Sequence, residues 1–403
     1  MALSGRALVA AMCAGQVGNL LPHVVVPAVM AQHLIPAWRL SASEAGLMAS
    51  SFALGYMLAV PFLTALTDRM DARSILLTGS AVSGLATFTF GCLADGLWSA
   101  IAIWAIAGIG FAGAYMPGLK ALVDRLPPGD SSRSVTLYTA TFSVGVGLSF
   151  LTAQIAADAL GWRWAFWATA LGPLAMVATC LGMAPVAPAP SSRRLLDFQP
   201  VFRNRPAMGF ILGYGAHCFE LYALRTWIVA FWAFVAGRHG GSALLEPMTV
   251  SVIATVLAMP ASIIGNEAAI RFGRHRAIVL FMCIAGLAAI LIGATTSAAP
   301  GVLLALLLFY SIAIPADSGA LTSGMTLSAE PRYRGATMAM HSTVGFGLSA
   351  AGAWAIGVSL DAGGGMDTTA GWLAAFLVMA AGGLMGPIAI WWSLRRTDVT
   401  PLD

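Results

Sequence analysis

The chain has 403 residues, of which 59% are hydrophobic and only 9% are charged, and its formal net charge is +4. Soluble domains carry about 25% charged residues, so this chain cannot cover a water-facing surface and most of its exterior must face lipid. The small net charge argues against a nucleic-acid partner. The five cysteines lie apart in apolar segments without CxxC or His-rich spacing, so we expect no disulfide framework, metal site or cofactor.

Apolar stretches bounded by charge, Pro/Gly clusters or Trp predict twelve membrane-spanning helices, each near the ~20–25 residues that a tilted span needs. They cover residues 6–30, 44–66, 74–93, 98–124, 134–158, 164–183, 206–234, 246–270, 277–296, 302–325, 336–360 and 371–394. The longest polar interval between them, residues 184–205, is Pro-rich and basic, which is typical of a flexible linker. The sequence therefore predicts an all-α membrane protein in which two six-helix bundles, residues 1–183 and 206–403, flank this linker.

The basic residues predict the orientation of the helices, because cytoplasmic loops are enriched in Lys and Arg. With a cytoplasmic N-terminus, most arginines fall on the cytoplasmic side, and only Arg39, Arg163 and Arg238 fall on the other side. We expect both termini to be cytoplasmic, in a multi-pass protein of the bacterial inner membrane.

A short internal repeat supports the division into two halves. Val144-Gly-Val-Gly-Leu-Ser149 in the fifth span recurs as Val344-Gly-Phe-Gly-Leu-Ser349 in the eleventh. Small residues at this spacing let helix backbones approach closely in lipid. Parallel six-helix repeats are a feature of one large transporter architecture.

Local motifs resemble those of the major facilitator superfamily, and the resemblance covers essentially the whole chain. The loop after the second span, Asp68-Arg-Met-Asp-Ala-Arg73, is similar to the family's D-R-x-G-R-R signature. The loop after the eighth span, Gly265–Arg276, carries a second copy. The junction of spans five and six, Leu160-Gly-Trp-Arg-Trp-Ala-Phe166, has a form common in the family. The resemblance implies a carrier that works by alternating access.

The resemblance also implies that the loop after the second span is a cytoplasmic latch. In the family, its acidic residue helps to hold the two halves together, and the matching residues here are Asp68, Arg69 and Arg73. Asp71 stands where the family usually has Gly, so the geometry of the turn is open. An alternative is that these charges only set topology.

Two departures from family patterns bear on proton coupling and on multidrug export. In the fourth span, Trp104 replaces the Arg of the family's R-x-x-x-G-x-G-x-A pattern, which excludes proton coupling through that residue. The fifth span lacks the Gly-Pro-x-x-Gly-Gly pattern typical of drug–proton antiporters. Both departures argue against multidrug export without establishing uptake.

Polar residues at membrane depth are costly and indicate function by default. In the resembling family, spans one, four, seven and ten line the cavity. The first span carries Gln16, Asn19 and His23, which fall within an arc of about 60° on a regular helix. We predict that they bind solute, although hydrogen bonds between helices would explain them as well.

The seventh span carries His217, Glu220 and Arg225. His217 and Glu220 share one face, while Arg225 points about 140° away from Glu220. His217 is predicted to bind solute or to carry a proton. Arg225 is predicted to bind an anionic solute or to pair with another helix, and Glu220 to carry a proton. A structural ion pair, or a metal held by the HxxE pair, remains an alternative.

The tenth and fourth spans supply the remaining candidates. Tyr310 is predicted to bind solute, and Asp317, seven residues later beyond the helix-bending Pro315, to carry a proton or to form a structural bridge with Arg225. Tyr115 and Lys120 are also predicted to bind solute, unless Lys120 pairs with Asp124 at i+4.

We therefore expect a monomeric secondary active transporter that moves a small polar or anionic organic solute across the bilayer, coupled to protons, and not an enzyme. Within the same fold, a uniporter, exchanger or drug exporter remains possible. In other classes, a membrane enzyme using His217, Glu220 and His341, or a channel, remains possible.

Overall fold

The computed structural model describes residues 3–127, 131–188, 197–241 and 244–394, and all regular structure within these segments is helical. The residues 189–196 of the predicted linker lie outside the described segments. The helices are long because apolar runs meet few breakers, and their ends follow local signals. One example is the capping box of Ser41 and Glu44 at the start of the second span.

The first half contains six spans. They are formed by α1 (Gly5–Leu20) with α2 (Val25–Val29), the π-helical turn η1 (Met30–Leu34) and α3 (Ile35–Trp38), then α4 (Ala42–Leu66), α5 (Ala72–Leu93), α6 (Leu97–Val123), α7 (Ser131–Leu160), and α8 (Trp162–Ala170) with α9 (Gly172–Leu181). The first span is broken, with a bend of 47° between Gly5–Leu20 and Val25–Trp38.

The second half contains the short helix α10 (Gln199–Arg203) and six more spans. These are α11 (Arg205–Arg238), α12 (Pro247–Phe272), α13 (Arg274–Ala294), α14 (Pro300–Ala313) with the 3₁₀ turn η2 (Ile314–Asp317) and α15 (Ser318–Ser328), then the 3₁₀ turn η3 (Pro331–Tyr333) with α16 (Arg334–Ala362), and α17 (Thr369–Leu394). Eleven described helical segments are long and apolar enough to cross a membrane, or twelve with the bent first pair. The predicted number of spans is confirmed.

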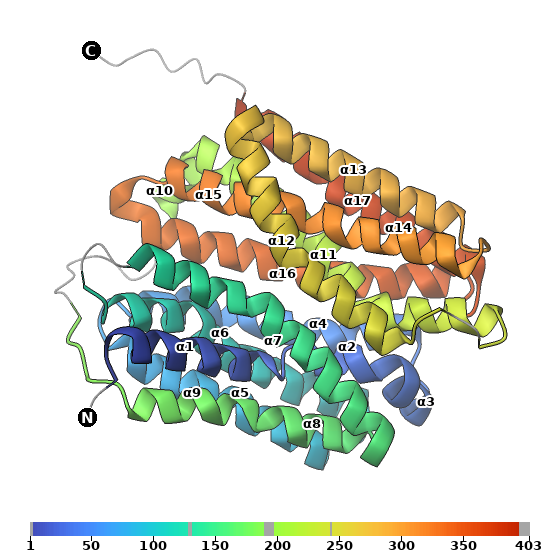
Figure 1. Ribbon diagram of the computed structural model, residues 1–403, viewed down its shortest axis with the longest axis horizontal. Coiled ribbons are helices and arrows are strands. Elements are labelled where there is room, and N and C mark those ends of the chain that lie inside the picture. Colours follow the sequence, from blue (N-terminus) through green and yellow to red (C-terminus); the bar gives the residue numbers. More distant parts are fainter. Residues whose placement is uncertain (1–2, 128–130, 189–196, 242–243, 395–403) are drawn as a thin grey trace.

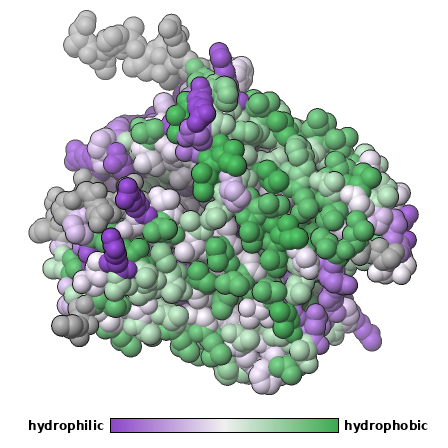
Figure 2. All heavy atoms as spheres, viewed as in Figure 1, coloured by the Kyte–Doolittle hydropathy of each residue, from purple (hydrophilic) through white to green (hydrophobic). Residues whose placement is uncertain are grey.

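The two halves lie side by side as separate bundles, α1–α9 and α11–α17 (Figure 1). We call the end that carries loop 67–71 and residues 182–188 and 197–204 the linker end, and the end that carries loops 39–41 and 363–368 the opposite end. Apolar residues form a broad band over one face, and polar residues gather at both ends (Figure 2). This distribution is the one expected of a protein that spans a bilayer.

The halves meet closely towards the opposite end, where α4 packs along α16. Gly46 lies against the backbone of Ala353, and Gly357 lies against the backbone of Ala42, with no room for a Cβ at either glycine. Ser50 Oγ donates a hydrogen bond of 2.7 Å to the Ala350 carbonyl. Small residues therefore allow backbone contact between the halves here.

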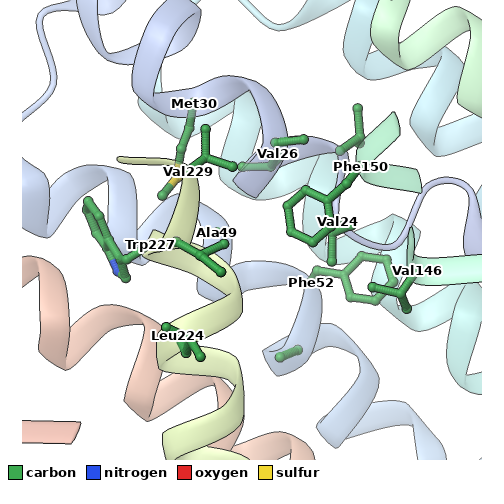
Figure 3. Close-up of a cluster of buried hydrophobic side chains, with 14 of the residues drawn as sticks. Val24, Val26, Met30, Ala49, Phe52, Val146, Phe150, Leu224, Trp227 and Val229 are labelled. Atoms are coloured by element: carbon green, nitrogen blue, oxygen red, sulfur yellow. The ribbon is translucent and has the colours of Figure 1, made fainter. Parts of the chain in front are cut away.

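Apolar side chains extend this contact into the middle of the molecule. In Figure 3, Ala49 of α4 lies beside Leu224 and Trp227 of α11, whereas Val24 at the break and Phe52 lie near Val146 and Phe150 of α7. The Trp227 indole N–H donates to the Ala353 carbonyl at 2.9 Å, so its polar atom is satisfied in this core.

Candidate functional site

The break in the first span places a polar residue at the centre of the molecule. Pro22 has no N–H, and residues 21–24 form turns in place of helix. Ser149 of α7 satisfies the freed backbone groups, because its hydroxyl donates to the Leu21 carbonyl and accepts from the Val24 N–H. His23 projects from this break and is 4% exposed.

His23 joins the two halves. Its Nε2 lies 3.1 Å from the Tyr222 hydroxyl of α11. Its ring also packs against Phe52, Phe111 and Phe142, with centroids 5.1–5.4 Å apart. His23 Nδ1 is buried without a hydrogen-bond partner in the described residues, so one polar atom of the ring remains available to a ligand or water.

Arg225 lies close to this contact and is 7% exposed. Its guanidinium carbon is 5.5 Å from the centroid of the Tyr222 ring and 6.0 Å from that of Phe142. Among the described residues, no carboxylate lies within 4.0 Å of Arg225. A cavity of about 30 Å³ between the halves is lined by both Arg225 and His23, and it has room for about one water molecule.

The predicted bridge between Arg225 and Asp317 is wrong. Asp317 Oδ1 lies 2.7 Å from His217 Nδ1, and both side chains are buried. The contact lacks the alignment of a regular hydrogen bond, since neither atom has a hydrogen-bond partner in the described residues. Asp317 ends the η2 turn of the tenth span, and its carboxylate contacts His217 on α11 and not Arg225.

Glu220 is buried inside the second half. The Tyr310 hydroxyl donates to Glu220 Oε1 at 2.8 Å, and a Cβ at Gly383 of α17 would collide with the carboxylate. Glu220 therefore faces α14 and α17, while Arg225 faces the first half, as the angle of about 140° between them predicts. The predicted solute-binding residue Tyr310 is a partner of Glu220.

The other two polar residues of α1 are also buried. Gln16 Oε1 accepts from the Tyr138 hydroxyl of α7 at 2.8 Å. Gln16 Nε2 and both polar side-chain atoms of Asn19 have no partner among the described residues. Hydrogen bonding between helices therefore accounts for the Oε1 atom of Gln16 but not for its Nε2 atom. Both polar side-chain atoms of Asn19 are available to a ligand.

The structure separates the two candidates of α6. Tyr115 stacks on Phe111 and meets Phe142 edge-on, so it belongs to the ring cluster around His23. Lys120 lies nearer the linker end and forms a 3.0 Å ion pair with Asp124. The pair at i+4 is the alternative that the spacing offered for Lys120.

Two partners were missed by the sequence analysis. Tyr222 and Tyr138 are hydrogen-bonded to predicted site residues from other helices. The position of Tyr222, three residues before Arg225 and so on a neighbouring part of the same face, was the signal that could have found it. His341 is buried, and its ring stacks on that of Tyr214 with the two ring centroids 3.8 Å apart. In the described residues, no group of three His, Cys, Asp or Glu side chains could hold a metal ion.

Asp71 organises the loop after α4. Asp71 caps α5 by accepting from the Arg73 N–H, and it also accepts two hydrogen bonds from Arg125, at 2.7 and 2.9 Å, and one from the Val186 N–H. Its φ of −56° needs no glycine. Burial raises the pKa of the Asp71 carboxyl, but the hydrogen bonds and charge of Arg125, with the two N–H groups, outweigh it and hold that pKa below its usual value.

Of the predicted latch residues, Asp68 is exposed at the linker end. Arg73 Nε donates to the Cys180 carbonyl within the first half. The latch role between the halves stays a prediction.

The comparisons with known proteins agree with this fold. A family model described as Major Facilitator Superfamily matches residues 7–353. The chain is 35% identical over 112 residues to a protein named probable anion transporter 4, chloroplastic, from Arabidopsis thaliana, and that match covers 27% of this chain and 21% of the relative.

Three solved structures share the fold at low sequence identity. A bacterial homologue of the human lysosomal transporter Spinster, inward-facing and occupied, is 18% identical with a TM-score of 0.72, covering 96% of this chain and 95% of that one. The nucleoside transporter NupG is 14% identical with a TM-score of 0.72, covering 97% and 100%. A POT family peptide transporter is 15% identical with a TM-score of 0.73, covering 98% of both chains. With twelve spans in two bundles and a family match over most of its length, the chain belongs to the major facilitator superfamily.

Proposed function

We propose that this protein is a secondary active transporter of a small organic anion, and that Arg225 binds the anionic group. The observation that carries the proposal is a permanently charged guanidinium, 7% exposed, without a carboxylate partner among the described residues. An unpaired buried charge costs several kcal/mol. A carboxylate ligand offsets this cost, because the guanidinium fork matches its two oxygens.

The position of Arg225 suits alternating access. It lies where α11 meets the first half, beside the contact between His23 and Tyr222, so a ligand there touches both halves. The name of the anion transporter relative supports the class of solute. In this proposal, rocking of the two bundles moves the solute, with Asn19 and Gln16 supplying further polar contacts.

Coupling is proposed to use protons. Glu220 and Asp317 are buried carboxylates on the seventh and tenth spans. Glu220 accepts a hydrogen bond from the Tyr310 hydroxyl, and Asp317 contacts the His217 imidazole. Protonation of either would change the charge of the second half during the cycle. The linker end is proposed to be cytoplasmic, in a monomeric protein of the bacterial inner membrane.

The test uses purified protein in proteoliposomes, with ligand-induced thermal stabilisation as the binding readout. A panel of organic anions should include at least one that stabilises the native protein and fails to stabilise Arg225→Gln. Arg225→Lys should weaken binding of that anion, because Lys keeps the charge but lacks the fork. Binding of the anion unchanged in both variants would refute the site.

Coupling is tested separately from binding. If Glu220 carries the proton, Glu220→Gln should abolish accumulation driven by a proton gradient and spare exchange of solute for solute. The matched variant Asp317→Asn tests the other carboxylate in the same way. Gradient-driven accumulation at the native level in both variants contradicts proton coupling through these residues.

The orientation has its own test. Tags in the 184–205 linker and at the C-terminus should react only after cells are permeabilised, and a tag near Gly240 should react in intact cells. Labelling of the linker in intact cells contradicts the orientation.

A further inference from the structure

Arg225 is shared by two cavities, and the second is apolar. It lies within the second half between α11, α12 and α14, encloses about 20 Å³, and is lined by Leu221, Leu224, Arg225, Ile228, Ala254, Thr255, Ala258 and Ser311. Both hydroxyl groups in this lining donate hydrogen bonds to backbone carbonyls of their own helices. Thr255 donates to the Ser251 carbonyl at 2.8 Å, and Ser311 donates to the Leu307 carbonyl at 2.7 Å. The cavity surface is almost wholly apolar, so Arg225 lines it mainly with its aliphatic stem.

The other face of Arg225 carries aromatic rings beside polar groups such as His23 and Thr226. The rings of Phe142 and Tyr222 flank the guanidinium, and Phe52 and Trp104 line the cavity between the halves. A hydroxyl group on the ligand would lose its hydrogen bonds to water on entering the apolar cavity beside Ala254 and Ala258.

The charge of the site limits the charge of the ligand. Among the described residues that line the two cavities, Arg225 is the only Lys or Arg. Arg225 can match one negative charge. A second anionic group on the same small ligand would be buried among apolar side chains without a partner, which is strongly unfavourable.

We infer that the solute is a monocarboxylate with a short apolar substituent, which enters the cavity beside Ala254 and Ala258 while the carboxylate binds Arg225. The volume of about 20 Å³ holds roughly one methyl-sized group. The inference rests on the proposed function, because it requires that Arg225 binds the anion. It adds that one charge and one small apolar branch decide which anions bind.

The first experiment measures binding of three acids of similar size to the full-length protein in nanodiscs: isobutyrate, glycerate and malonate. Isobutyrate has one charge and a branched apolar body, glycerate has hydroxyl groups in place of the branch, and malonate has two charges. We expect isobutyrate to bind at least about tenfold more tightly than the other two, since they bury unpaired polar groups. Inorganic phosphate is included as a small anion without an apolar part and should bind weakly.

The second experiment fills the cavity. Ala258→Val adds two methyl groups to its wall and should weaken binding of isobutyrate about tenfold while leaving acetate, which has no branch, unchanged. The control Val256→Leu enlarges a half-exposed side chain of the same helix outside the cavity and should change neither affinity. Melting of each variant without ligand checks that it is folded.

The outcomes separate this inference from the proposal beneath it. Preference for malonate, glycerate or phosphate, abolished by Arg225→Gln, would keep anion transport and overturn the monocarboxylate. Equal weakening of acetate and isobutyrate by Ala258→Val would overturn the role of the cavity. Binding of none of these anions or of any anion in the wider panel would overturn the proposed function itself.

Discussion

The two ends of the molecule hold their helices in different ways. At the opposite end, hydrogen bonds and backbone contacts cross between the halves. The Asp361 carboxylate of α16 accepts from the N–H groups of Ala42 and Ser43 at 3.0 and 2.8 Å, which caps the start of α4 from the other bundle. Asp361 thereby supplies a negative charge where the helix N-terminus favours one.

At the linker end, the hydrogen bonds of Asp71 and Asn204 join elements of one half. Asp71 connects α5, α6 and the segment after α9 within the first half, and Asn204 donates to the Ser328 carbonyl within the second. Alternating access needs contacts between halves that break and bundles that stay intact. In the proposed cycle, we therefore expect the opposite-end contacts to be released and the Asp71 network to keep the first half intact.

The largest effect is expected from Gly357→Ala. The new Cβ would meet the Ala42 carbonyl and the Ser43 backbone, which cannot move without separating α4 from α16. We expect transport to fall at least about tenfold, because overpacking at a backbone contact displaces the helices. Hydrogen–deuterium exchange at the start of α4 should rise with it. The control Gly335→Ala lies on the same helix, where nothing is within 4 Å of the added Cβ, and unchanged transport in both variants would contradict the role of this contact.

Asp361→Asn should have a smaller effect on the same end. The amide keeps one acceptor oxygen but loses the negative charge that caps α4. The contact between α16 and the start of α4 should therefore be weakened but not lost. We expect exchange of the N–H groups near Ala42 and Ser43 to rise about fivefold. Asp367→Asn, in the exposed loop of the same end, is the matched control. Equal exchange in both variants would show that Asp361 does not hold the halves together.

Asp71→Asn tests the linker end. The substitution leaves Arg125, whose side chain is 5% exposed, without its carboxylate, so we expect a loss of about 2 kcal/mol in stability at pH 7. Because the folded pKa of Asp71 lies below its unfolded value, this stabilisation is present above the unfolded pKa of about 3.9 and is lost as pH falls through the folded pKa.

The measurement for Asp71 is a series of melting curves against pH. The difference between native protein and variant should shrink below about pH 4. A difference that stays constant down to pH 3 would mean that the Asp71 charge is not its source.

The fold was predictable because a membrane span is a local property of the sequence. Each apolar run of sufficient length became a span, and the break at Pro22 was the local detail that the hydrophobic pattern concealed. The direction of Arg225 relative to Glu220 was also predictable, since one regular helix carries both residues.

The partners of these residues were not predictable, because they depend on how helices cross. Asp317 could have met Arg225 or His217, and the η2 turn places it at His217. Similarly, Asp71 gave no sequence signal beyond its departure from the family pattern, yet it binds Arg125, 54 residues away.

The smallest effect on stability, and the sharpest test of the two-end comparison, is expected from Asp68→Asn. Asp68 is exposed at the linker end, so its neutralisation should change stability by less than about 0.5 kcal/mol. If the family latch applies here, Asp68 contacts the second half only after the linker end has closed. Transport should then slow about threefold while exchange at the start of α4 rises less than in Asp361→Asn, because the variant disfavours the state in which the opposite end is open. Native transport rates together with native cysteine accessibility on both sides would remove Asp68 from the latch.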